Sequence, residues 1–386
     1  MTTHQSPVNS HQSPITKIGI TGQAGFVGTH LYNTLGLQPD KFERIPFEDS
    51  YFEDVEKLKS FVAQCDTIVH LAAMNRHNDP EVIYETNIGL VKKLIDALEQ
   101  TGSKPHVIYS SSIQEDIDNL YGKSKKEGRE LLAKWAEKNS AVFTGFVFTN
   151  IFGPFGNPYY NSFIATFCHR LTHGETPVIE TDKKVPLLYV KDAVQLIINS
   201  ILEKENIAEL RIKPITEKKV TEVLDVLKKY KELYFDKGII PCLDNSFERD
   251  LFNTFVCYID HKNFFPFHLK LNTDDRGSFV ETIKLNSGGQ VSFSTTVPGI
   301  TRGNHFHIRK AERFAVIKGK ATIELRRIGT DEVLSFELDG DQPSFVDMPI
   351  WYTHNITNIG DEELYTIFWI SEHFDADDPD TYFEKV

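Results

Sequence analysis

Cysteine is scarce in this chain, and its apolar stretches are short. The four cysteines lie far apart and show no paired spacing: Cys65, Cys168, Cys242 and Cys257. This pattern argues against a disulfide framework and against a paired-cysteine metal site, so we expect reduced thiols in a cytoplasmic protein. No apolar run approaches the roughly 20 residues that a membrane span needs. The sequence therefore predicts no membrane-spanning helix.

Positive charge is also in deficit. The chain has 42 Lys and Arg against 55 Asp and Glu, which gives a formal net charge of −13 at pH 7. This balance disfavours nucleic acid and anionic membrane as main partners, although a local basic pocket for a phosphate group is compatible with it. The length of 386 residues suffices for two or three domains, and 28 Phe predict well-filled cores.

The first stretch, from Met1 to Pro14, is polar and repeats His-Gln-Ser-Pro, first from His4 and again from His11. It lacks the apolar core of a signal peptide. Its composition predicts a disordered tail rather than a metal site.

Strands and helices alternate after this tail. Lys17–Thr21 reads as a short buried strand, and a turn with glycine at every third position leads from it into an amphipathic helix. Such a turn lets the backbone approach a pyrophosphate, and the helix N-terminus supplies free N–H groups. Its candidate cofactor contacts are Gly22, Gly25, Phe26, Val27 and Gly28. Further strands at 67–73 and 106–112, each followed by a helix, predict an α/β Rossmann-like parallel sheet with helices on both faces.

Hydroxyl groups gather at the end of one predicted strand, at Ser110–Ser112. A helix follows in which Tyr121 and Lys125 are four residues apart and share a face. A nearby lysine favours the phenolate, so this tyrosine could exchange a proton with a carbonyl oxygen that a serine hydroxyl holds. An isolated Tyr-x-x-x-Lys is more often an exposed pair, but here it follows a glycine-rich cofactor turn.

Residues 17 to about 240 resemble the extended short-chain dehydrogenase/reductase family, which acts on nucleotide sugars. The matching residues are Thr21-Gly22-x-x-Gly25-Phe26-x-Gly28, His70-Leu71-Ala72-Ala73, Asn87, Ser110–Ser112, Tyr121-x-x-x-Lys125, Asn150-x-x-Gly153-Pro154 and Tyr189-Val190-x-Asp192. The resemblance implies a catalytic group of Ser112 (with Ser111 as rival), Tyr121 and Lys125. It also implies cofactor contacts at Leu71, Ala72, Ala73 and Lys125.

Three features depart from the family pattern. Only eight residues separate Ser112 from Tyr121, and Val147 stands where an arginine is common. We expect NADPH as the cofactor. The third departure is that the acidic residues Glu48 and Asp49 follow the second strand, where they suit a ribose 2′-hydroxyl, so NADH stays open.

The pattern changes from Phe264 to short, alternating, aromatic strands with frequent turns, which predicts an all-β barrel or sandwich. In particular, we expect the strands Arg313–Lys318 and Lys320–Arg327 to pair across Gly319. The boundary falls between about Phe255 and Asn263. The predicted organisation is a tail at 1–14, a cofactor-binding domain at 15–255 and a barrel at 262–386.

Histidines mark the barrel sequence. His305 and His307 are one residue apart on a predicted strand and so project to one face, with Glu312 and His354 downstream. Each of these histidines alone would more often be a hydrogen-bonded core residue. Together the four residues predict a site for zinc or a similar divalent ion. Their spacing resembles the two signature motifs of the cupin family, a small β-barrel, although Trp351 departs from its pattern.

Two other stretches, Asp275–Phe279 and Arg302–His305, resemble motifs of deoxysugar 3,5-epimerases, a cupin branch. That resemblance implies that His305 is a proton-transfer base and that no metal is required. Both roles of His305, ligand and base, stay open.

The whole chain resembles the bifunctional capsular polysaccharide synthesis enzymes of the CapF family, which join an extended reductase to a C-terminal cupin. Matching strings include Asn161-Ser162-x-Ile164–Cys168, Asp274–Phe279, Pro298–Thr301, Tyr352–Asn355 and Asp380–Glu384. The resemblance implies C3 epimerisation of a UDP-2-acetamido-2,6-dideoxy-4-hexulose in the barrel and reduction of its C4 ketone in the first domain. The implied product is UDP-2-acetamido-2,6-dideoxy-L-talose, a step toward UDP-N-acetyl-L-fucosamine for capsule or O-antigen.

Two alternatives remain at this point. One is a single-activity 4-keto-sugar reductase whose barrel is a zinc-stabilised oligomerisation or sugar-binding module. The other is a non-catalytic nucleotide-binding sensor, which the intact Ser/Tyr/Lys set argues against. The long aromatic strands are compatible with a homodimer or tetramer.

Overall fold

The computed structural model describes residues 14–386, so the predicted tail lies outside the described residues except for Pro14. The chain forms two compact units. Within the described residues, the first comprises 14–149 and Val190–Lys213, and the second comprises Asn150–Tyr189 and Pro214–Val386. Over residues 14–386, no helix has the length and apolar character that crossing a membrane requires.

A parallel six-stranded sheet forms the centre of the first unit. Its strand order is β2-β1-β3-β4-β5-β8, and every neighbouring pair is parallel. The strands are β1 (Thr16–Thr21), β2 (Phe42–Ile45), β3 (Thr67–His70), β4 (His106–Ser112), β5 (Phe143–Phe148) and β8 (Ile207–Arg211). Because β1, β3 and β4 are adjacent and parallel, the turns that follow them meet at one edge of the sheet.

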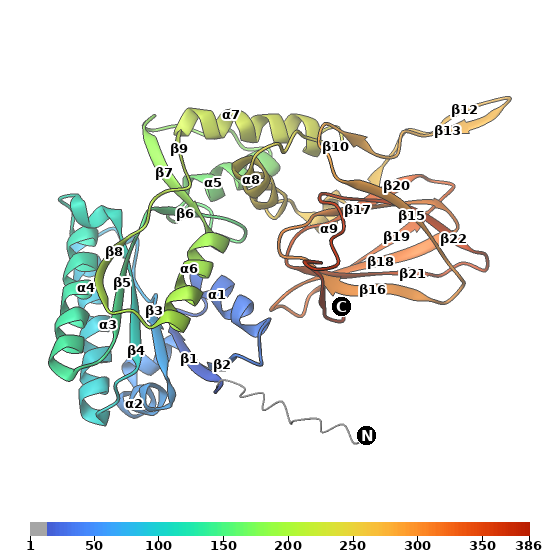
Figure 1. The fold of residues 1–386 in the computed structure, drawn as a ribbon. Coiled ribbons are helices and arrows are strands. Elements are labelled where there is room, and N and C mark those ends of the chain that lie inside the picture. The colour runs from blue at the N-terminus through green and yellow to red at the C-terminus, as the bar shows by residue number, and fades with distance from the viewer. Residues whose placement is uncertain (1–13) are drawn as a thin grey trace, which may run out of the picture. The chain divides into compact units, whose positions relative to one another are not determined.

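Helices cover both faces of this sheet, as predicted. They are α1 (Phe26–Gly36), α2 (Val55–Gln64), α3 (Pro80–Thr101), α4 (Leu120–Asn139) and α6 (Val190–Glu203), with short 3-10 turns η1 (Asp49–Glu53) and η2 (Ile113–Asp116). Figure 1 shows α3 and α4 on one side of the sheet and α1 and α6 on the other. The long helix α3 begins at Pro80 after the N-cap Asp79, whose carboxylate accepts from Glu81 N, and ends at Thr101, followed by the C-cap Gly102 with φ 66°.

The second unit begins with a small three-stranded sheet in the order β6-β7-β9. Its strands are β6 (Asn150–Phe152), β7 (Lys184–Tyr189) and β9 (Thr216–Lys219). The helices of this part are α5 (Phe163–Thr172), α7 (Val220–Tyr230), α8 (Ser246–Val256) and α9 (His261–Phe264), and a π-helical turn, η3 (Lys231–Phe235), continues α7. One apolar face drives their packing: Val223 and Leu227 of α7 and Leu251 and Phe255 of α8 are all fully buried.

Two antiparallel five-stranded sheets complete the second unit, which confirms the predicted all-β barrel. One has the order β11-β20-β17-β22-β15 and the other β19-β18-β21-β16-β23. The first sheet contains β11 (Phe267–His268), β15 (Gln290–Thr296), β17 (Glu312–Lys318), β20 (Ser344–Met348) and β22 (Leu364–Ile370). The second contains β16 (Thr301–Phe306), β18 (Lys320–Arg327), β19 (Val333–Asp339), β21 (Tyr352–Asn358) and β23 (Tyr382–Phe383). Side chains of both sheets share one apolar core, which includes Val316, Ile323 and Phe345.

The predicted pairing of Arg313–Lys318 with Lys320–Arg327 is wrong. Strand β17 pairs with β20 and β22, whereas β18 pairs with β19 and β21. Gly319 therefore carries the chain from one sheet to the other instead of closing a hairpin. Its φ is +85°, and a Cβ there would lie 3.2 Å from the Leu364 Cα, so glycine suits this corner.

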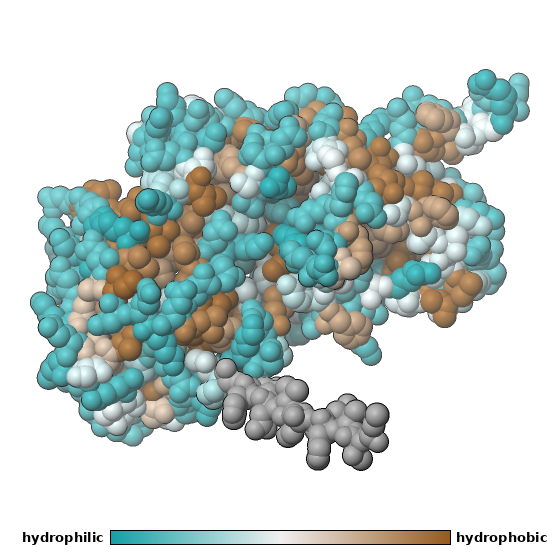
Figure 2. Space-filling view, viewed as in Figure 1, coloured by the Kyte–Doolittle hydropathy of each residue, from teal (hydrophilic) through white to brown (hydrophobic). Residues whose placement is uncertain are grey.

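Two short strand pairs lie beside the barrel. Strand β10 (Ile239–Ile240) pairs in parallel with β14 (Lys284–Leu285), and β12 (Asn272–Asp274) forms a hairpin with β13 (Gly277–Phe279). Every residue of β12 and β13 is exposed, and Figure 2 shows a hydrophilic tip on this hairpin. The Asp-Arg-Gly motif at 275–277 therefore lies at an exposed turn.

A buried ion pair of the barrel, between Arg313 and Asp347, also makes hydrogen bonds with the segment that follows α7. The Arg313 guanidinium donates from Nε and Nη2 to the two carboxylate oxygens of Asp347, at 2.7 and 2.9 Å. Its Nη1 donates to the Gly238 carbonyl at 2.6 Å, and the Tyr234 hydroxyl donates to Asp347 at 2.6 Å. Arg313 is fully buried, so its charge depends on these partners.

We expect Asp347→Ala to lower the free energy of unfolding by about 3–5 kcal/mol, because it leaves a buried guanidinium without its carboxylate. Chemical denaturation of the full chain, followed by Trp fluorescence, measures this change. Glu362→Ala removes an exposed ion pair with Lys318 in the same barrel and is the control, with no measurable shift expected. An unshifted midpoint for Asp347→Ala would contradict a stabilising role of the buried pair.

Candidate functional site

The glycine-rich turn after β1 has the geometry of a dinucleotide cradle. Gly22 has φ +71°, and a Cβ on it would lie 2.8 Å from the Ala72 backbone nitrogen. A Cβ on Gly28 would lie only 2.2 Å from the Gly22 carbonyl oxygen. Gly25 is the N-cap of α1 and has no side-chain cap, so Phe26 and Val27 begin the helix with backbone N–H groups available for an anion.

The segment after β3 lies against this turn. Leu71 N donates to the Thr21 carbonyl at 3.1 Å, and Ala72 N donates to the Thr21 hydroxyl at 3.4 Å. Further along, the Asn87 amide exchanges hydrogen bonds with the backbone of Met74. The structure thus brings the predicted cofactor residues at Gly22–Gly28 and Leu71–Ala73 together at one edge of the sheet.

The serines at the end of β4 have different partners. The Ser111 hydroxyl donates to Glu115 at 2.7 Å, and that buried carboxylate also pairs with Arg129 at 2.9 Å. The half-buried Ser112 instead accepts a backbone hydrogen bond from Gln114 at 3.2 Å. Because Ser111 is committed to a buried ion pair, Ser112 is the better candidate for holding a substrate oxygen.

Tyr121 and Lys125 lie one turn apart near the start of α4. Lys125 is buried, and its ammonium lies 4.5 Å from the centroid of the Tyr109 ring. Burial lowers the pKa of Lys125 to about 7, while the Glu115 carboxylate opposes that fall. The Tyr109 ring is thus a platform that favours the charged lysine beside the predicted proton donor.

The structure also gathers the four predicted metal ligands. One ligand atom each from His305, His307, Glu312 and His354 lies within 4.8 Å of every other. His305 comes from β16, His307 follows that strand directly, Glu312 opens β17 and His354 lies on β21. His305 is half-buried, whereas the other three are buried.

Hydrogen bonds fix the orientation of two of these rings. His307 Nδ1 bonds to the Asp380 carbonyl, and His354 Nδ1 bonds to the Tyr352 carbonyl at 3.2 Å. A carbonyl only accepts, so each Nδ1 carries a proton, and in the neutral imidazole each Nε2 keeps a free lone pair. His354 Nε2 lies 3.0 Å and His307 Nε2 3.3 Å from the same Glu312 oxygen.

The two Nε2 atoms and the Glu312 oxygen that face one another are better suited to binding a cation than to contacting each other. Among residues 14–386, His307 Nε2, His354 Nε2 and Glu312 Oε2 have no hydrogen-bond partner although all three are buried. Two neutral imidazoles around a carboxylate leave an uncompensated buried negative charge, which is costly. A divalent cation would satisfy all three atoms, and Nδ1-to-carbonyl bonds are the usual outer-shell support of histidine ligands.

The charges in this cluster shift its pKa values. Burial, followed by the neighbouring His354, lowers the pKa of His305 to about 4. Burial also acts to lower the pKa of His307, but Glu312 outweighs it and the pKa rises. The two histidines oppose the effect of burial on Glu312, whose carboxyl pKa falls well below its usual range.

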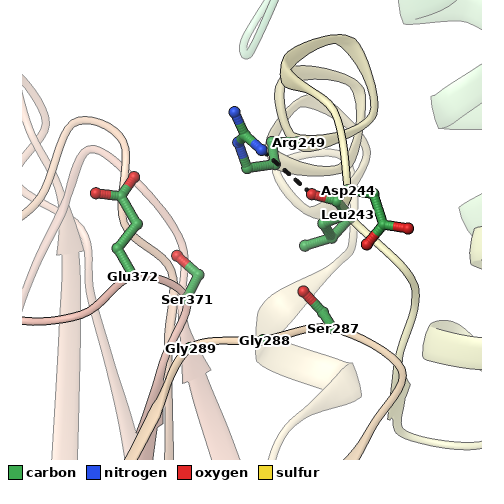
Figure 3. Close-up of a pocket in the computed structure, with 8 residues that line it drawn as sticks. All are labelled: Leu243, Asp244, Arg249, Ser287, Gly288, Gly289, Ser371 and Glu372. Carbon is green, nitrogen blue, oxygen red and sulfur yellow. Dashed lines mark hydrogen bonds between the residues drawn. The ribbon is translucent and has the colours of Figure 1, made fainter.

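A separate cavity of about 350 Å³ lies elsewhere in the second unit (Figure 3). Figure 3 shows Ser371 and Glu372 on one side of it and Leu243, Asp244 and Arg249 on the other. Arg309 pairs with Glu372 at 3.0 Å, and Arg249 donates to the Leu243 carbonyl at 3.3 Å. Since Glu372 and Arg249 have internal partners and the cavity contains none of the four candidate ligands, we assign it no role in the chemistry.

Two supporting residues escaped the sequence analysis. Glu115, held by Arg129, accepts the hydrogen bond from Ser111, and Asp380 supplies the carbonyl that orients His307. Local pattern could not indicate either one, because neither has a motif of its own. Asp380 does fall in the string Asp380–Glu384, which was singled out only for its resemblance.

The fold and these two groups of residues define a short-chain dehydrogenase/reductase domain joined to an antiparallel barrel of the cupin type. Residues 18–212 match the NAD dependent epimerase/dehydratase family, and residues 272–382 match the Polysaccharide biosynthesis C-terminal domain. The chain belongs to the CapF family of capsular polysaccharide proteins.

Three relatives carry this assignment. A UDP-2-acetamido-2,6-beta-L-arabino-hexul-4-ose reductase of Pseudomonas aeruginosa is 32% identical over 369 residues, which cover 95% of this chain and 98% of the relative. The crystal structure of the capsular polysaccharide assembling protein CapF from Staphylococcus aureus is 38% identical, with a TM-score of 0.62 and coverage of 96% and 100%. A structure of CapF with the inhibitor 3-isopropenyl-tropolone is 34% identical, with a TM-score of 0.57 and the same coverage.

Proposed function

We propose that this chain is a bifunctional nucleotide-sugar enzyme. Its barrel epimerises C3 of a UDP-2-acetamido-2,6-dideoxy-4-hexulose, and its first domain reduces the C4 ketone with NAD(P)H to UDP-2-acetamido-2,6-dideoxy-L-talose. This product is a step toward UDP-N-acetyl-L-fucosamine for capsule or O-antigen. The observation that carries the proposal is the presence, on one chain, of a Ser/Tyr/Lys group at a dinucleotide cradle and a buried His/Glu cluster. The reductase name of the Pseudomonas aeruginosa relative supports the substrate class.

The first domain would perform the reduction with residues at the edge of its sheet. A nicotinamide cofactor supplies the hydride when bound against Gly22–Gly28 and Leu71–Ala73. Tyr121 donates its proton to the oxygen at C4, and the Ser112 hydroxyl holds that oxygen in place. The Lys125 ammonium favours the phenolate that remains and so makes Tyr121 a stronger acid.

The barrel would perform the epimerisation. A C4 ketone acidifies the hydrogen on the adjacent C3, and His305 is the proposed base that removes it. The half-buried position of His305 at the open side of the cluster supports this role, since a base must reach the substrate. Reprotonation of the enolate on the other face inverts C3.

His307, Glu312 and His354 would hold zinc or a similar divalent ion, with His305 as a fourth ligand or as the base. Such an ion supplies Lewis-acid stabilisation of the negative charge that develops on the substrate oxygen. The inhibitor of the CapF relative supports a metal, because a tropolone carries adjacent carbonyl and hydroxyl oxygens that chelate divalent cations.

The two activities complement each other thermodynamically. Epimerisation beside a ketone is reversible, so the barrel alone would leave a mixture of C3 isomers. Reduction of the ketone removes the acidity at C3 and traps one isomer. This coupling is our reason for favouring two activities over a reductase with a barrel that only binds sugar or other subunits.

The His305 assignment has a direct test. We expect His305→Ala to lower the exchange of the C3 hydrogen with deuterated water by roughly 10²–10⁴-fold, the range for loss of a general base. Mass spectrometry of the UDP-4-keto sugar, incubated without NADPH, measures this exchange. His268→Ala, an exposed histidine on β11, is the matched control and should exchange as the wild type does.

Metal content separates the two roles of His305. If zinc is retained while exchange is lost, His305 is the base, and if both are lost, it is also a ligand. Wild-type exchange in a folded His305→Ala protein would remove His305 from the mechanism. That result would assign the exchange to another base.

A further inference from the structure

We propose that Asp380, close to the C-terminal end of the sequence, is a positioning residue that holds His307 ready as a metal ligand. This inference rests on the metal site of the proposed function and deepens it. The two residues are 73 positions apart, and the Asp380 backbone carbonyl accepts the hydrogen bond from His307 Nδ1. The carbonyl therefore selects the tautomer whose Nε2 faces Glu312 and His354.

The Asp380 side chain holds that carbonyl in place. Its carboxylate accepts three successive backbone N–H bonds, from Ile308 at 3.3 Å, Arg309 at 3.0 Å and Lys310 at 3.1 Å. These residues directly follow His307. One side chain thus fixes the backbone after the ligand while its own backbone fixes the ligand's ring.

The surrounding chain makes this contact rigid. Before Asp380, the buried Lys310 ammonium donates to the Pro379 carbonyl at 3.0 Å. After it, β23 pairs with β16 at His305 and Phe306, and Glu384 N donates to the Asn304 carbonyl at 3.0 Å. The segment that carries Asp380 is therefore joined to the strand that carries His305 as well.

Burial and backbone conformation support a specific role. Asp380 is only 3% exposed although its side chain is a carboxylate. Its φ is +46°, in the left-handed region that side chains seldom adopt. Such strain persists where surrounding contacts impose it, and here those contacts are the three amides and His307.

The test compares three full-length variants with the wild type. Asp380→Gly removes the carboxylate and also relieves the positive φ, so backbone strain cannot account for a loss. Asp380→Asn keeps the shape and one acceptor oxygen. Asp378→Asn is the control, because this neighbouring carboxylate contacts the Arg309 side chain and not the three amides.

Zinc affinity and a cobalt spectrum provide the readouts. Zn²⁺ affinity is measured by competition with a chromophoric chelator, and the ligand field is read from the visible spectrum of the Co²⁺-loaded protein. We expect Asp380→Gly to bind Zn²⁺ roughly 10–100-fold more weakly, the usual effect of losing an outer-shell partner, with an altered Co²⁺ spectrum. Asp380→Asn should show a smaller loss and Asp378→Asn none.

The outcomes separate this inference from the proposed function. Wild-type affinity and an unchanged Co²⁺ spectrum in Asp380→Gly would overturn the role of Asp380 while leaving the metal site intact. If the wild type itself binds neither Zn²⁺ nor Co²⁺ at this cluster, the metal site fails and the inference fails with it. Should Asp380→Gly not fold, the smaller loss expected for Asp380→Asn is decisive, and wild-type affinity there overturns the role.

Discussion

Tyr121→Phe is expected to lower kcat for ketone reduction by roughly 10²–10⁴-fold, because it removes the proposed proton donor to the oxygen at C4. The ring stays in place on α4, so cofactor binding should not change. Loss of NADPH absorbance with the UDP-4-keto sugar measures turnover, and fluorescence titration measures NADPH binding.

The matched control for this prediction is Tyr84→Phe. Tyr84 lies on α3 of the same unit, and its hydroxyl donates to Glu127. That variant should turn over as the wild type does. Unchanged reduction in Tyr121→Phe would remove Tyr121 from the mechanism. The Ser/Tyr/Lys set would then no longer argue against a non-catalytic nucleotide-binding sensor.

Glu312→Gln is expected to weaken metal binding at the barrel cluster strongly and, with it, exchange at C3. Glu312 supplies the negative charge between His307 and His354, and a neutral amide is a poor substitute for it. We expect zinc affinity to fall by about 100-fold or more, beyond the 10–100-fold usual for outer-shell partners. Elemental analysis and deuterium exchange measure the two losses.

Glu337→Gln, an exposed residue on β19, is the control for charge removal in the same barrel. It should keep both metal and exchange. Wild-type exchange in a metal-free Glu312→Gln protein would show that the epimerase needs no ion, which is what the resemblance to deoxysugar 3,5-epimerases implies. Zinc retained at wild-type affinity would instead show that the ion is bound elsewhere.

The sequence predicted the parts of this protein whose signals are local. A strand, three glycines and a helix in immediate succession are enough to place the turn at Gly22–Gly28, because all its constraints lie within about ten residues. The grouping of the candidate metal ligands was predicted for a similar reason. His305, His307 and Glu312 fall within eight residues, and the structure brings His354 to them on the neighbouring strand β21.

The sequence could not predict which strands pair. Alternating strands on both sides of Gly319 suit a hairpin and a crossing between sheets equally well, and the choice depends on distant strands. Strand β17 pairs with β20 and β22, and those strands leave no place beside it for β18. The pairing of strands in this barrel is thus a property of the whole domain rather than of the turn.

Supporting residues escaped prediction for the same physical reason. Asp380 contacts His307 across 73 positions. Arg313 pairs with Asp347 and also donates to the distant Gly238 carbonyl. A buried charge has no local signature that separates it from a solvated one. Only the fold shows which carboxylates and guanidinium groups have lost access to water.

The central claim is that one chain both inverts C3 and reduces C4. The most direct measurement is NMR of the product that the wild-type protein forms from the UDP-4-keto sugar and NADPH in deuterated water. The account predicts an alcohol at C4 together with one deuterium at C3 in the inverted configuration. An alcohol at C4 with ordinary hydrogen and unchanged configuration at C3 would contradict it and would leave a reductase without an epimerase.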